Sequence, residues 1–67
     1  MSIAKITEIT SESKDGFDAA IREGIERATR TLKNVSSVWV KDHEVAVKNN
    51  KPERFRVTLK VTFVLED

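Results

Sequence analysis

A segment that runs from Arg54 to about Leu65 limits the possible folds more than any other part of the sequence, because its apolar and polar residues alternate. Successive residues of a strand point to opposite faces of a sheet, so the pattern predicts one long strand with one apolar face and one polar face. The apolar face needs a second layer to cover it. Its residues are Phe55, Val57, Leu59, Val61, Phe63 and Leu65, and the polar residues are Arg54, Arg56, Thr58, Lys60 and Thr62.

An amphipathic helix that starts at Phe17 can supply that layer, because its apolar residues recur at helical spacing. We expect it to run to about Lys33, with Ser13 as the N-cap and Asn34 at the C-terminal end. Gly24 lies within the apolar stripe, which predicts a close approach between the helix and a strand. The stripe consists of Phe17, Ala20, Ile21, Gly24, Ile25, Ala28 and Leu32.

Two more segments rich in β-branched residues, Ile3 to Ile9 and Val35 to Val47, are typical of strands. A polar turn from Lys48 to Glu53 contains the only Pro and predicts an antiparallel hairpin with the alternating strand. The element order is therefore β-α-β-β, an α+β fold. Because no repeat or linker divides the chain, we expect a single domain, residues 1–67.

The only Trp, Trp39, lies in the middle of the second expected strand. If its neighbours Val38 and Val40 face the helix, the opposite face of the sheet receives Trp39 and the residues that share its alternation. A large aromatic side chain outside the monomer's core suggests an interface or a ligand. The residues expected on that face of the strand are Ser37, Trp39, Lys41 and His43.

The only His does not suggest a metal centre. Asp42 and Glu44 share one face of the strand and His43 takes the other, so the three side chains cannot converge within one chain. The absence of Cys removes disulfides and thiolate metal sites. We therefore expect no metal ligands within the chain.

Length and charge narrow the classes of function. A chain of 67 residues has a small core, and without disulfides or a structural metal its expected supplement is self-association. Twelve basic residues against eleven acidic ones give a net charge of +1, which favours neither nucleic acid nor a membrane surface as a partner.

No apolar run has the length of a signal peptide or a membrane span, so we expect a cytoplasmic protein. No Gly-rich phosphate loop or Ser-His-Asp arrangement indicates an enzyme.

Three stretches together resemble the dodecin family: the helix entry S-x-D-G-F-D-A-A-I (Ser13 to Ile21), the pair Arg27-Ala28, and the final strand from Phe55 to Leu65. The resemblance spans essentially the whole chain. It implies a three-stranded antiparallel sheet wrapped around one helix, and assembly of twelve copies into a hollow homododecamer. It also implies binding and storage of a flavin, riboflavin or FMN, without catalysis.

The resemblance implies a flavin site at subunit contacts, where a Trp early in the second strand stacks on the flavin and a Gln early in the third strand hydrogen-bonds the polar edge of its ring. On this chain the stacking Trp falls on Ser37 and the ring-edge Gln on Arg56, while Asp42 matches an acidic position near the pocket. Trp39 lies two residues beyond Ser37, on the same face and about 7 Å farther along. The candidate flavin-binding residues are Ser37, Trp39, Asp42 and Arg56.

Three interpretations of Trp39 follow. Trp39 can replace the stacking Trp, with Arg56 as a donor to the flavin. It can instead pack at a subunit contact, with Arg56 paired to Asp42 or Glu44. It can also be part of the monomer's core. The functional alternative to flavin storage is a flavin-free dodecameric shell with a structural role or with divalent-ion or anion binding.

Overall fold

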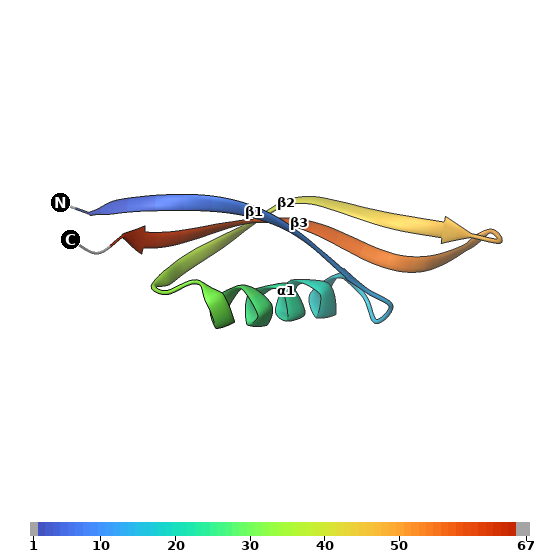
Figure 1. Cartoon of the computed structure of the whole chain (residues 1–67). Helices are drawn as coiled ribbons and strands as arrows, with labels where there is room; N and C mark the ends of the chain where they lie inside the picture. Colours follow the sequence, from blue (N-terminus) through green and yellow to red (C-terminus); the bar gives the residue numbers. More distant parts are fainter. Residues whose placement is uncertain (1, 66–67) are drawn as a thin grey trace.

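One helix and three strands follow one another in the computed structural model, which describes residues 2–65. Their order is β1 (Ile3–Ser13), α1 (Phe17–Thr31), β2 (Val35–Lys48) and β3 (Lys51–Leu65). The strands form one antiparallel sheet in the order β1-β3-β2, so the alternating segment is the central strand (Figure 1). The predicted β-α-β-β order and α+β class are confirmed.

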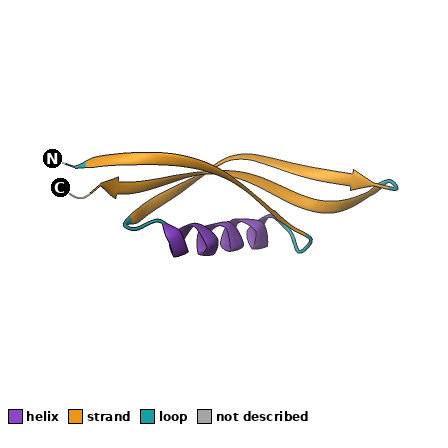
Figure 2. Cartoon of the chain, in the orientation of Figure 1, coloured by secondary structure: helices purple, strands orange, loops and turns teal. Residues whose placement is uncertain are grey.

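The core lies between α1 and the alternating face of β3. Val57, Leu59 and Val61 are fully buried there, against Ala20 and Ala28 of the helix. Burying each of the large side chains contributes about 1.5–3 kcal/mol, which makes this face the main source of stability. The helix covers one face of the sheet only, and the hairpin of β2 and β3 continues past it (Figure 2).

Gly24 lies at a close approach of the two layers, as predicted. A Cβ atom on Gly24 would lie 2.7 Å from Cδ1 of Leu59 and 3.0 Å from Cβ of Ser11. Both distances are shorter than an ordinary van der Waals contact, so only a residue without a side chain lets the helix pack at this depth.

The prediction that Ser13 caps the helix is wrong. Ser13 ends β1, paired with Phe55, because β1 continues along β3 well beyond the predicted end at Ile9. Its buried hydroxyl accepts a hydrogen bond of 3.0 Å from the backbone N–H of Asp15. The residue before the helix is Gly16, whose φ of 116° suits glycine and which has no side chain for capping.

The helix is shorter at its other end than predicted, because it ends at Thr31 and not near Lys33. Asn34 follows with a φ of 61°, the left-handed conformation that asparagine tolerates after a helix. The chain thereby reverses into β2, and the backbone N–H of Val64 donates to the carbonyl oxygen of Asn34 at 3.0 Å.

The hairpin turn is tighter than predicted. It consists of Asn49 and Asn50, with φ values of 52° and 63°, while Lys48 and Lys51 already pair as strand residues. Two consecutive positive φ values are typical of a type I′ turn, which matches the twist of the strands it joins. No helix within residues 2–65 is long and apolar enough to cross a membrane.

Candidate functional site

The sheet face opposite α1, which we call the outer face, presents its side chains in rows across the three strands. Directly paired residues of antiparallel strands point to the same side, so the register defines each row. Four successive rows, each written in the order β1, β3, β2, are Glu12–Arg56–Glu44, Thr10–Thr58–Asp42, Glu8–Lys60–Trp39 and Ile6–Thr62–Ser37.

Trp39 lies on this outer face and is 63% exposed. The prediction that it stands outside the monomer's core is confirmed, and the interpretation of Trp39 as a core residue is wrong. The ammonium of Lys60, directly opposite on β3, lies 5.1 Å from the centroid of the Trp39 ring. Trp39 is therefore an exposed aromatic ring with a cation over its face.

The predicted position of His43 is wrong. The β2–β3 register shifts between Val40 and Asp42, so that Lys41 is an extra residue in β2 and every later residue changes face. His43 consequently pairs with Val57 on the helix side, where its ring meets Phe17 edge-on at 4.8 Å between centroids.

The same bulge brings carboxylates to the outer face. Asp42 pairs with Thr58 and Glu44 with Arg56, so the two acidic residues share one face, as predicted, but it is the face of Trp39. Lys41 also stays on the outer face, as predicted, and its Nζ lies 3.5 Å from Oε1 of Glu8 across the central strand.

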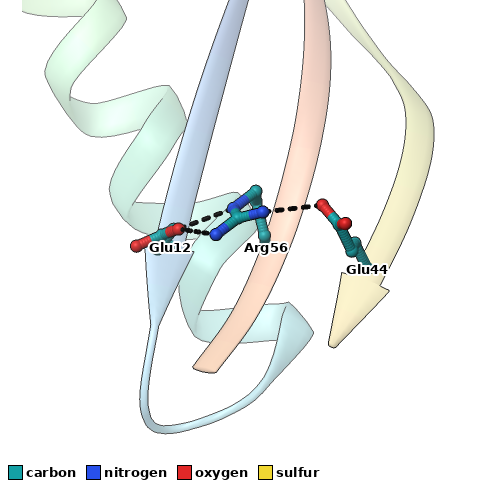
Figure 3. Close-up of polar contacts among 3 residues, drawn as sticks. All are labelled: Glu12, Glu44 and Arg56. Atoms are coloured by element: carbon teal, nitrogen blue, oxygen red, sulfur yellow. Dashed lines mark hydrogen bonds and ion pairs between the residues drawn. The ribbon is translucent and has the colours of Figure 1, made fainter. Parts of the chain in front are cut away.

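Arg56 is held between two carboxylates (Figure 3). Its Nε donates to Oε1 of Glu12 at 2.6 Å, and its Nη1 donates to Oε1 of Glu44 at 2.8 Å. The hydrogen bond with Glu12, then that with Glu44, raises the pKa of Arg56 above its ordinary value. The Arg56 guanidinium thus stays charged and joins both edge strands to the centre.

Sequence reasoning found one of these partners and missed the other. The pairing of Arg56 with Glu44 across the hairpin is confirmed for the monomer. Glu12 was missed because the first strand was predicted to end at Ile9, before it reaches Glu12. The sequence did contain a signal for this ion pair, because Glu12 is an acidic residue only three positions beyond the predicted end of the strand.

The four candidate residues form two groups within the chain. Asp42 and Arg56 line one hollow of about 360 Å³ together with His43, Glu44 and Thr58. Ser37 lies in the row of Thr62, six residues from Arg56 along β3, which corresponds to about 20 Å. One planar ring cannot contact both, so a pocket that uses both positions needs residues from two chains.

Residues 2–65 contain no group of three or more His, Asp or Glu side chains placed to hold a metal ion. The pair Asp42 and Glu44 is flanked by Arg56, which already occupies one oxygen of Glu44. A cation at this hollow would therefore compete with the guanidinium for the same carboxylate.

These features define a class: a small β-α-β-β subunit with one covered sheet face and one open face that carries an aromatic residue among charged rows. The model of the dodecin family matches residues 3–66, and the chain belongs to this family.

Solved dodecin structures agree with the fold over nearly the whole chain. The dodecin of Streptomyces davaonensis is 33% identical, with a TM-score of 0.92 over 98% of this chain and 97% of that one. The dodecin of Streptomyces coelicolor is 29% identical, with a TM-score of 0.92 over 98% and 94%. An arginine-to-alanine variant of the Thermus thermophilus dodecin is 28% identical, with a TM-score of 0.93 over the full length of both. A comparison with curated proteins found no match.

Proposed function

We propose that this chain is a non-catalytic flavin-binding and flavin-storage subunit, assembled as a hollow homododecamer, in which Trp39 supplies the stacking surface. The observation that carries the proposal is the 63% exposure of Trp39 on the sheet face that no helix covers. An indole ring is the widest aromatic platform a protein offers, and flavin stacking requires such a surface.

Exposed apolar side chains support the assembly. Five buried apolar residues among residues 2–65 are a small core, and the chain has no Cys for a disulfide to supplement it. Large apolar side chains instead lie at the surface, including Ile6 at 58% and Val47 at 67% exposed. Contacts between subunits would cover such residues, and family membership makes the dodecamer the expected form.

The candidate contacts divide between two subunits in this proposal. Ser37 and Trp39 come from one chain, and Asp42 and Arg56 come from a neighbour, because about 20 Å separates the Ser37 and Arg56 rows within one chain. Ser37 is a small, exposed residue where the family places its stacking Trp, so its side chain would not block a ring that stacks on Trp39 in the next row.

A second candidate function is a flavin-free shell with a structural or ion-binding role. It is favoured by Arg56, which occupies the family's ring-edge position but is bound to Glu12 and Glu44. A guanidinium also offers donors only, whereas the amide it replaces offers a donor and an acceptor.

Flavin fluorescence separates the two functions. Purified protein is titrated into riboflavin and into FMN, and stacking on Trp39 should quench the flavin emission to a saturating end point. A Trp39→Leu variant should quench much less, and its sedimentation mass shows whether the assembly is intact. Absence of quenching by the unaltered protein at micromolar concentrations would leave the flavin-free shell. A sedimentation mass near that of a monomer or a dimer would refute the dodecamer.

A further inference from the structure

Three cationic side chains, Lys41, Arg56 and Lys60, lie on the outer face in the stretch that runs from the hollow to the row of Trp39, and two of them are paired with carboxylates. Lys41 pairs with Glu8, and Arg56 pairs with Glu12 and Glu44. Within residues 2–65, Lys60 has no carboxylate within ion-pair distance. Glu8 is directly opposite Lys60 on β1, yet the contact its carboxylate makes is with Lys41.

Lys60 lies against Trp39 instead. Its Nζ is 5.1 Å from the centroid of the Trp39 ring, and Lys60 and Trp39 are direct partners in the β2–β3 register. An ammonium on a flexible four-carbon stem carries three hydrogen-bond donors, which can turn toward an acceptor beside the ring. The aromatic surface and the unpaired cation therefore form one two-residue unit.

We propose that Lys60 determines ligand specificity at the proposed flavin site by donating a hydrogen bond to a carbonyl oxygen of a ring stacked on Trp39. The inference rests on the proposed function. When the ring stacks, the ammonium moves from the indole to the edge of the ligand, where the carbonyl oxygens of the isoalloxazine ring lie. The ligand class is a planar heteroaromatic ring with carbonyl acceptors on its edge.

Arg56 of the same chain cannot perform this role for Trp39. It lies four residues from Lys60 along β3, about 13 Å away within one chain, and its Nε and both terminal nitrogens contact Glu12 or Glu44. Moving Arg56 to a ligand would leave both carboxylates without their cation, whereas Lys60 gives up only its contact with Trp39. Trp39 lies two residues beyond the position of the family's stacking Trp, and Lys60 supplies a hydrogen-bond donor in the same row as Trp39.

The test compares Lys60→Met, which removes the charge and keeps most of the stem, with Lys60→Arg, which keeps the charge. Lys41→Met is the control, because it removes a neighbouring cation that is paired with Glu8. Riboflavin and FMN are titrated with each protein while flavin fluorescence is followed. Lys60→Met should bind both flavins about tenfold or more weakly, since a hydrogen bond from a charged donor is lost. Lys60→Arg should stay within about threefold of the unaltered protein.

A comparison of riboflavin with FMN shows whether Lys60 donates to a ring carbonyl or to the phosphate, because only FMN has a phosphate. Equal losses for the two flavins support a ring carbonyl, and a loss confined to FMN would place Lys60 on the phosphate and overturn the assignment. Unchanged binding by Lys60→Met, or an equal loss in Lys41→Met, would also overturn it while leaving flavin binding itself intact. If the unaltered protein fails to quench either flavin, the proposed function fails and this inference fails with it. Sedimentation and thermal unfolding of each variant confirm that the assembly and fold are unchanged.

Discussion

Glu12 and Arg56 are separated by 44 positions in the sequence, and a hydrogen bond of 2.6 Å joins the Glu12 carboxylate to Nε of Arg56. Glu44 approaches the same guanidinium from β2, at 2.8 Å from Nη1. One side chain of the central strand therefore holds both edge strands on the face that lacks a helix. The Arg56 side chain is 36% exposed, so water and salt screen this network in part.

Replacing Arg56 with Met should lower the thermal midpoint, because Glu12 and Glu44 would then face each other across β3 without a cation between them. The loss should shrink in 1 M NaCl, where the screening length is about 3 Å. Thermal unfolding at low and high salt measures both effects. Arg22→Met is the matched control, since Arg22 is an exposed helix residue with no ion pair among the described residues. An equal loss in the control would contradict the prediction.

The direction in which the stability contribution of Arg56 changes with pH follows from its raised pKa. The pKa of Arg56 is raised by its hydrogen bonds, first with Glu12 and then with Glu44. A group with a raised folded-state pKa contributes stability below its ordinary value and loses it only as the pH rises through the raised value. The difference in thermal midpoint between the unaltered protein and Arg56→Met should therefore be constant from about pH 7 to 9. A difference that falls steadily over that range would contradict it.

Gly24→Ala should destabilise the protein even though alanine favours a helix. The helix gains about 1 kcal/mol from the substitution, but overpacking costs about 1–3 kcal/mol. The new Cβ would meet Leu59 Cδ1 at 2.7 Å, and Leu59 is fully buried and cannot move away freely. Denaturant unfolding should show a net loss of about 1 kcal/mol.

Leu59→Val provides the control for that clash, because it removes the atom that the new Cβ would meet. Gly24→Ala should cost less in the Leu59→Val background than in the unaltered protein, since the two sites are in contact and their effects are not additive. Strict additivity of the two free-energy changes would contradict a clash at Leu59.

Substitutions at Asn50 test whether the hairpin turn has the type I′ conformation. Asn50 has a φ of 63°, which costs a residue with a Cβ about 1–2 kcal/mol unless the side chain is Asn or Asp. Asn50→Gly should leave the free energy of unfolding unchanged or raise it slightly, because Asn-Gly is the preferred pair of a type I′ turn. Asn50→Ala should lower it by about 1 kcal/mol. The reverse order of these two variants in denaturant unfolding would exclude the I′ turn.

The sequence patterns that repeat regularly predicted the fold well. The alternation of β3, the helical stripe and the exposure of Trp39 all follow from spacing, because one residue's face determines the next. The errors begin where that regularity breaks. The Lys41 bulge reversed the expected face of His43, and the extension of β1 to Ser13 brought Glu12 beside Arg56. A local sequence period predicts neither the bulge nor the β1–β3 register. The two partners of Arg56 could therefore be identified together only from the structure.

The family's pocket can be tested by restoring its residues. Ser37→Trp together with Arg56→Gln should strengthen flavin binding, measured by fluorescence quenching, if these positions meet across a subunit contact. Because the Ser37 and Arg56 rows are about 20 Å apart in one chain, neither single variant should gain much alone. Arg56→Gln alone should chiefly lower stability, since Glu12 and Glu44 lose their cation. A gain in the double variant that exceeds the sum of the single gains identifies a pocket shared between chains. Equal binding by the double variant and Ser37→Trp alone would show that the restored Gln does not reach the flavin.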